Sequence, residues 1–150
     1  MTRIMIVEDE RDVADYLRLT LTKAGYEATQ HHCLRDAMAD QDRYDLIVLD
    51  LALPDVKGDW DALVALRGRY LDPFIPIMIF SARSMIAGDG EKAARLGATD
   101  VFTKSSSMYA DTFLRHVSVA LNRRYRNCEV AEMKKTLDDV SGQLKTVPPK

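Results

Sequence analysis

Five polar side chains in this 150-residue sequence each follow or close a short apolar run, and together they could bind a divalent cation and a phosphoryl group. Three carboxylates repel one another unless a cation joins them, and Mg²⁺ prefers such hard oxygen ligands. A hydroxyl and an ammonium group could then bind the oxygens of a phosphoryl group during its transfer. The five residues are Glu8, Asp9, Asp50, Ser81 and Lys104.

The apolar runs before these residues have the pattern of buried strands. The runs at 4–7, 46–49 and 77–80 are continuous rather than alternating, as expected for a parallel sheet covered on both faces. Five strands that alternate with five helices predict an α/β fold with helices on both faces of the sheet. The remaining predicted strands cover 27–31 and 100–104, and the predicted helices contain 13–24, 34–38, 60–67, 93–96 and 113–121, with Gly88 and Gly90 in the loop before the fourth helix.

In an open parallel sheet, the residues that follow the strands meet at one edge, and ligands bind there. We therefore expect the five polar side chains to share one cleft. Asp50 could act as a nucleophile, because an ionised carboxylate needs no general base to attack phosphorus. Lys104 could supply a positive charge to the phosphoryl group, and Ser81 could donate a hydrogen bond to it.

The whole pattern resembles the receiver domain of two-component response regulators. Any one matching segment alone would be a weak signal, but the combination is specific. The resemblance covers residues 2–124 and implies a flavodoxin-like five-stranded parallel sheet in the strand order 2-1-3-4-5. The matching segments are "VEDE" at 7–10, "LIVLDLALPDVKG" at 46–58, "IMIFSA" at 77–82 and "LGATDVFTK" at 96–104.

The resemblance also implies roles for the individual residues. Asp50 would accept a phosphoryl group from a histidine kinase or a histidine phosphotransfer protein. Asp9 and Asp50 would bind Mg²⁺ directly, Glu8 would help through a water molecule, and the backbone carbonyl of Ala52 would supply another ligand. Such a domain is a regulatory phosphoacceptor and promotes only its own phosphorylation and dephosphorylation.

By the same likeness, Ser81 and Phe102 match the switch pair of the family. The hydroxyl would move toward the phosphoryl group, and the aromatic ring would turn inward. Two departures affect this expectation. Ser105 stands where the family usually has a proline after the lysine, so a trans peptide bond is expected there. Ala52 and Arg83 occupy positions that tune the lifetime of the phosphoryl group in the family.

Other interpretations of the same residues stay open. The chain could be a receiver-like scaffold that binds partners without phosphorylation. It could also be a Mg²⁺-dependent phosphohydrolase of the haloacid dehalogenase type, although Ala52 stands where that class needs a second acid. Taken singly, Asp50 could be a capping residue, Ser81 a helix N-cap, Phe102 a core aromatic and Lys104 a surface lysine.

Composition indicates a soluble protein of a reducing compartment, for which we expect the cytoplasm. The formal net charge is −2, which does not suggest a nucleic-acid or membrane partner. Cys33 and Cys128 are far apart and have no metal-ligand spacing. The cluster "HHC" at 31–33 has side chains that alternate in a strand, and "RRYR" at 123–126 suits a solvated helix end; neither is expected to bind metal or nucleic acid.

The segment 125–150 lies beyond the predicted receiver domain 1–124, and heptad spacing predicts that the last helix continues into it. This stripe could pack on its own domain, or it could pair with a partner. A homodimer is expected either through the fourth and fifth helices or through this extension. A stand-alone receiver and a fragment of a longer regulator both fit the sequence. The apolar positions are Val130, Met133, Leu137, Val140 and Leu144, and Pro148-Pro149 end the helix.

Overall fold

A computed structural model of the chain describes residues 1–70, 72, 74–82, 88–104 and 110–145. Strands and helices alternate along the whole chain, as the sequence predicts. The elements are β1 (Arg3–Val7), α1 (Arg11–Lys23), β2 (Glu27–His31), α2 (Leu34–Ala39), β3 (Leu46–Leu49), α3 (Asp61–Arg69), β4 (Ile77–Ser81), α4 (Asp89–Arg95), β5 (Asp100–Thr103) and α5 (Ala110–Lys145).

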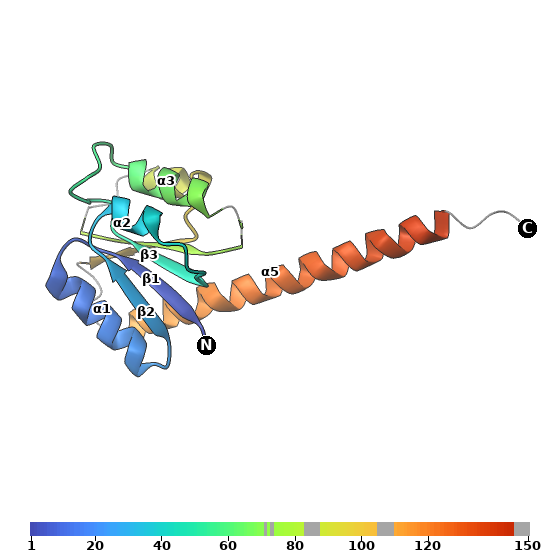
Figure 1. Ribbon diagram of the computed structural model, residues 1–150, viewed down its shortest axis with the longest axis horizontal. Helices are drawn as coiled ribbons and strands as arrows, with labels where there is room; N and C mark the ends of the chain where they lie inside the picture. The colour runs from blue at the N-terminus through green and yellow to red at the C-terminus, as the bar shows by residue number, and fades with distance from the viewer. Residues whose placement is uncertain (71, 73, 83–87, 105–109, 146–150) are drawn as a thin grey trace, which may run out of the picture.

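The five strands form one parallel sheet in the order β2-β1-β3-β4-β5, which confirms the predicted flavodoxin-like topology. Helices cover both faces (Figure 1). On one face, α1 and α5 pack on the sheet through side chains such as Leu17 and Phe113. On the other face, α2, α3 and α4 contribute Ala37, Leu63 and Ala93. The central strands β1, β3 and β4 are buried almost throughout, because helices cover both of their faces.

Glycine follows the ends of two helices, but the predicted position of another glycine is wrong. Gly25 follows α1 with φ of 95°, and Gly97 follows α4 with φ of 103°, so both adopt the left-handed conformation that favours glycine after a helix. Gly88 precedes α4 as its N-cap, as expected for a loop residue. Gly90 lies inside α4 rather than in the loop before it, so that prediction is wrong. The acidic and basic residues around Gly90 favour a helix enough to offset its low propensity.

The last helix, α5, is 36 residues long and has two different halves. Its first half is buried on the sheet, and its second half projects away from the rest of the molecule (Figure 1). The predicted continuation of this helix is therefore confirmed. Four apolar side chains of the projecting half are exposed, so this stripe does not pack on its own domain. They are Val130, Met133, Leu137 and Val140, with exposed fractions of 64%, 65%, 65% and 47%.

Several predicted features fall outside the described residues. These are the roles of Arg83 and Ser105, the side chain of Leu144, and the end of the helix at Pro148-Pro149. Among the residues that the structure describes, no helix is long and apolar enough to cross a membrane.

Candidate acidic site at the carboxyl edge of the sheet

Lys104 joins two buried carboxylates at the carboxyl ends of β1, β3 and β5. Its Nζ lies 2.8 Å from Oε2 of Glu8 and 3.3 Å from Oδ2 of Asp50. The side chains of Glu8 and Asp50 are only 1% and 4% exposed, whereas that of Lys104 is 13% exposed. The strand ends therefore meet as predicted. We predicted from the sequence that Lys104 supplies a positive charge to a phosphoryl group. In the unphosphorylated protein, the shortest ion pair of Lys104 is with Glu8.

Burial changes the proton affinity of this site. Desolvation raises the pKa of Glu8, and the nearby charge of Asp50 adds to this effect, whereas Lys104 opposes both; the net result is a pKa of about 7. Desolvation lowers the pKa of Lys104, but its bonds to Glu8 and Asp50 outweigh this, so the pKa is raised overall. Two buried carboxylates held by one ammonium group are thus short of positive charge, and a second cation would stabilise their ionised forms.

Glu8, Asp9 and Asp50 form a group that could hold a metal ion. One ligand oxygen from each of the three lies within 4.8 Å of the others. Glu8 and Asp50 are buried, and Asp9 is exposed at the mouth of the group. Three carboxylate oxygens with one open side match the preference of Mg²⁺ for hard ligands and retained waters. The residues present therefore fit the predicted metal.

A hollow of about 350 Å³ opens beside this group and is lined by Asp9, Ala52 and Ser81, among others. The backbone N–H of Ala52 donates a hydrogen bond to Oδ1 of Asp50 at 3.1 Å, which fixes the carboxylate at the end of β3. Ser81 is 1% exposed at the end of β4. The predicted site residues Asp9, Ala52 and Ser81 thus line a space that a phosphoryl group could enter, and Asp50 is hydrogen-bonded to Ala52 at its edge.

The loop after β3 is held in place by contacts that the sequence did not reveal. Both carboxylate oxygens of Asp55 accept hydrogen bonds from the first backbone N–H groups of α2, those of Leu34 and Arg35, at 2.9 and 2.8 Å. Asp55 therefore caps a helix 20 residues earlier in the chain. Gly58 donates its N–H to Asp61, and a side chain at Gly58 would collide with that carboxylate at 2.6 Å. Such contacts keep the wall of the hollow fixed.

The structure does not bring Phe102 beside Ser81. Phe102 pairs in register with Phe80, and Thr103 pairs with Ser81, so Phe102 and Ser81 project from opposite faces of the sheet. The Phe102 ring is 5% exposed and already packs on Phe80 and Phe113, with ring centroids 5.7 and 5.9 Å away. The predicted inward turn of Phe102 therefore finds no support here, and its placement fits a core aromatic.

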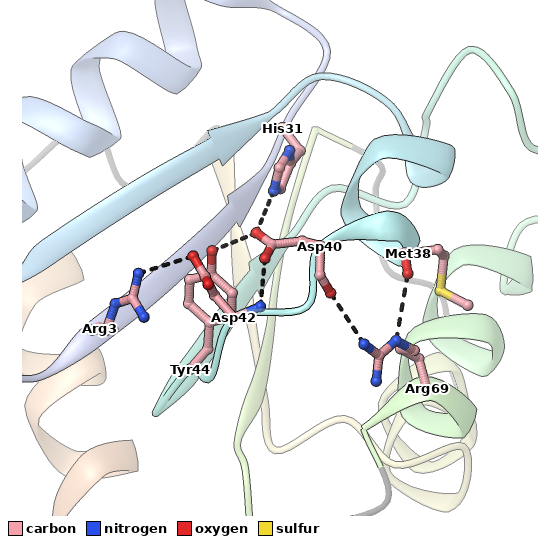
Figure 2. Close-up of polar contacts among 7 residues, drawn as sticks. All are labelled: Arg3, His31, Met38, Asp40, Asp42, Tyr44 and Arg69. Carbon is pink, nitrogen blue, oxygen red and sulfur yellow. Dashed lines mark hydrogen bonds and ion pairs between the residues drawn. The ribbon is translucent and has the colours of Figure 1, made fainter.

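Asp40 directly follows α2, and its carboxylate is partly buried, with 10% of the side chain exposed (Figure 2). Its Oδ2 accepts a hydrogen bond from the Tyr44 hydroxyl at 2.5 Å and lies 2.8 Å from Nε2 of His31. Nδ1 of His32 lies 3.0 Å from the carbonyl oxygen of Glu8. His31 and His32 thus have separate structural contacts.

Comparisons with known proteins agree with this fold. The family model described as "Response regulator receiver domain" matches residues 4–110. The chain is 37% identical over 106 residues to the transcriptional regulatory protein PcoR of Escherichia coli, covering 69% of this chain and 45% of PcoR. It is 33% identical over 134 residues to the transcriptional regulatory protein KdpE of Mycobacterium tuberculosis, covering 88% of this chain and 56% of KdpE. The chain thus spans about half the length of these relatives.

A solved structure of a receiver domain has the same fold as this chain. The CheY-like response regulator receiver domain protein of Methanospirillum hungatei JF-1 superimposes with a TM-score of 0.75, covering 85% of this chain and 98% of that one, at 19% identity. At that identity the likeness concerns the fold alone.

Proposed function

Because this chain belongs to the response regulator receiver domain family, we propose that Asp50 is its phosphoacceptor and that phosphorylation of Asp50 controls its signalling state. The observation that carries this proposal is the ion-paired group of Lys104, Glu8 and Asp50 at the carboxyl edge of the sheet. A histidine kinase or a histidine phosphotransfer protein would supply the phosphoryl group. The homologous domains are regulatory, so the transfer ends on the chain itself rather than on a released product.

In the proposed transfer, a carboxylate oxygen of Asp50 forms a bond to phosphorus while the bond from phosphorus to the donor imidazole nitrogen breaks. The imidazole leaves with the electron pair of that bond. Glu8, Asp9, Asp50 and the carbonyl of Ala52 would hold Mg²⁺, which neutralises phosphoryl charge when bound. Lys104 would then exchange its contact with Asp50 for a phosphoryl oxygen, and Ser81 would donate a hydrogen bond from the end of β4.

Labelling with acetyl phosphate tests this proposal. The chain should acquire one phosphoryl group in the presence of Mg²⁺, and EDTA should abolish the labelling. Asp50→Asn should remove the labelling, whereas Asp36→Asn, which changes an exposed carboxylate on α2, should leave it unchanged. Labelling that persists in Asp50→Asn would contradict the assignment. Steady release of inorganic phosphate from a small phosphoester would instead favour the phosphohydrolase alternative.

We also propose that the projecting half of α5 pairs with the same segment of a second copy. The four exposed apolar residues recur with the 3-4 spacing of a coiled-coil seam, and an isolated helix of this length is marginal in water. Glu129 and Lys134 flank the seam. In a parallel pair, Glu129 of one copy would face Lys134 of the other, whereas an antiparallel pair centred on the seam would bring the two Lys134 side chains together.

Light scattering on charge variants tests this pairing. Glu129→Lys and Lys134→Glu should each weaken the dimer several-fold, and the double variant should recover it. Val130→Cys and Val140→Cys, each placed in a chain whose native cysteines are replaced by serine, should each form an intermolecular disulfide, because both positions meet their own copies only in a parallel pair. A monomeric wild-type chain, with and without Mg²⁺ and beryllofluoride, would contradict the pairing.

A further inference from the structure

A second groove lies at the opposite end of the sheet from the acidic site and has a volume of about 440 Å³. Its walls come from the segment before β3, the end of α3, the segment before β4, and α5. Three guanidinium groups and two phenol groups line it, those of Arg43, Arg69, Arg124, Tyr44 and Tyr70. The groove therefore sits where α5 begins to project from the sheet, away from the residues that we assign to phosphorylation.

Arg124 presents an unused buried donor in this groove. Its side chain is 17% exposed, and its Nη2 lies 3.7 Å from Asp45 and 3.9 Å from Asp72. Both distances exceed the roughly 2.7–2.9 Å of a charge-assisted hydrogen bond, so these acids attract the guanidinium group without saturating it. Nη1 is buried and has no hydrogen-bond partner among the described residues. Buried polar atoms in folded proteins are almost always paired with protein or with water, so this guanidinium donor is available to an acceptor that enters the groove.

Tyr70 supplies a second unpaired group. The residue is 7% exposed, and its hydroxyl has no hydrogen-bond partner in the described part of the chain. The neighbouring wall is fixed, as Figure 2 shows: Arg69 donates to the carbonyl oxygens of Met38 and Asp40 at 3.4 and 3.2 Å. Arg69 also lies 5.4 Å from the centroid of the Tyr70 ring. The unused hydroxyl thus belongs to a rigid wall rather than to a loosely placed side chain.

The charge of the groove favours a negative ligand. Of its two acidic lining residues, Asp42 is already paired with Arg3 at 3.1 Å (Figure 2). Asp72 and Asp45, which both lie near Arg124, remain against the three arginines, so positive side chains still outnumber negative ones. The unused atoms at Arg124 and Tyr70 are both able to donate, and a ligand rich in acceptor oxygens would satisfy both of them. Arginine is suited to this role because its planar fork matches oxyanions.

We propose that this groove binds the phosphate group of a small anionic molecule, with Arg124 and Tyr70 as its principal donors. The site is separate from Asp50 and does not depend on its phosphorylation. Arg124 is part of α5, and Tyr70 follows α3, so a bound phosphate would tie the root of the projecting helix to the body of the domain. Binding there would stiffen the helix at the point where it leaves the sheet.

Isothermal titration of the full chain with inorganic phosphate, in EDTA and at constant ionic strength, tests the proposal. EDTA removes any metal that would draw phosphate to the acidic edge. We expect saturable binding at one site. Arg124→Gln should weaken it about tenfold or more, and Tyr70→Phe, which removes only the hydroxyl oxygen, should weaken it a few-fold. Arg126→Gln is the matched control, because Arg126 is an exposed arginine on the same helix outside the groove.

Each outcome decides the question. Loss of binding in Arg124→Gln and Tyr70→Phe, with Arg126→Gln like the wild type, supports the site. No saturable binding up to tens of millimolar phosphate would overturn it, and so would binding that all three variants weaken equally. A parallel titration with malonate separates a preference for phosphate from a general affinity for small dianions: equal binding of both would overturn the phosphate assignment. Circular dichroism of each variant shows whether its fold is intact.

Discussion

The acidic edge of the sheet and the projecting half of α5 depart from the ordinary burial pattern in opposite directions. At the acidic edge, Glu8 and Asp50 are charged groups that are almost fully buried. On the projecting helix, Met133 and Leu137 are apolar groups that are each 65% exposed. Charged side chains are rarely buried unless they are paired, and large exposed apolar stripes mark contact surfaces. Each region therefore presents groups that a binding partner would stabilise.

The difference teaches which kind of partner each region requires. The acidic edge has two buried carboxylates for one ammonium group, so it requires a cation. The projecting helix has an exposed apolar seam, so it requires another apolar surface. The following predictions test that comparison, beginning with the largest expected effect.

The two halves of α5 should respond very differently to the loss of an apolar side chain. Phe113 is 2% exposed in the buried half, so Phe113→Ala should lower the free energy of unfolding by about 4 kcal/mol. Leu137→Ala removes a side chain that is 65% exposed and should change the unfolding of the monomer by less than about 0.5 kcal/mol. Urea unfolding of both variants at low protein concentration measures this. Similar losses in the two variants would show that the projecting half packs on the domain.

Removing the Lys104 ammonium group from the acidic edge should be the next largest effect. Lys104→Met leaves Glu8 and Asp50 facing each other without their ammonium partner, so at neutral pH in EDTA the free energy of unfolding should fall by about 3 kcal/mol. Mg²⁺ should recover part of this loss, because a cation would again lie between the carboxylates. Lys23→Met, which changes an exposed lysine on α1, is the control for urea unfolding. If Lys104→Met is destabilised and Mg²⁺ does not change its free energy of unfolding, the result would contradict a cation site.

Asp40 is a partly buried carboxylate that already has hydrogen-bond partners. Its pKa is lowered whereas that of Glu8 is raised, so the two carboxylates should respond to pH in opposite directions. Burial raises the pKa of Asp40, but hydrogen bonds from Tyr44 and His31 outweigh this and lower it overall. The same pairing and burial raise the pKa of Tyr44 to about 12. The ionised Asp40 carboxylate therefore stabilises the fold above the ordinary aspartate pKa, and this contribution disappears as the pH falls through the lowered value.

We accordingly expect Asp40→Asn to lower the free energy of unfolding by about 1–2 kcal/mol at neutral pH, and to approach the wild type below about pH 4. Asp42→Asn, in the same turn but exposed, should have a smaller effect. Urea unfolding across this pH range measures both variants. A loss for Asp40→Asn that stays constant down to about pH 3 would show that shape rather than charge carries the contribution of Asp40.

The sheet and the acidic edge were predictable because their signals are local. A continuous apolar run followed by Asp50 predicts both a buried strand and the residue at its end, and the alternation of strands with helices predicts a parallel sheet. The strand order came from the resemblance to receiver domains. The helical continuation through Leu137 was equally predictable, because apolar spacing is read directly along the chain. The sequence did not predict whether that apolar stripe packs on its own domain, because its exposure depends on the direction in which the helix leaves the sheet.

The missed features all depend on contacts between distant residues. Asp55 caps α2 only because the fold brings the loop after β3 to Leu34, and nothing near Asp55 in sequence indicates that. The pairing of Lys104 with Glu8 likewise depends on how far each side chain extends across the edge. The face occupied by Phe102 follows from the register of β5 against β4, which the sequence does not specify. Resemblance supplied a role for Phe102 that this register does not favour.

Locating the phosphoryl group tests the central claim most directly. The chain would be phosphorylated with acetyl phosphate and Mg²⁺ and then reduced with borohydride, which converts an aspartyl phosphate to homoserine, and its peptides would be mapped by mass spectrometry. We predict homoserine at position 50 and at no other aspartate. Homoserine at Asp9 or Asp55, or none despite stable folding and bound Mg²⁺, would contradict the assignment of Asp50 as the phosphoacceptor.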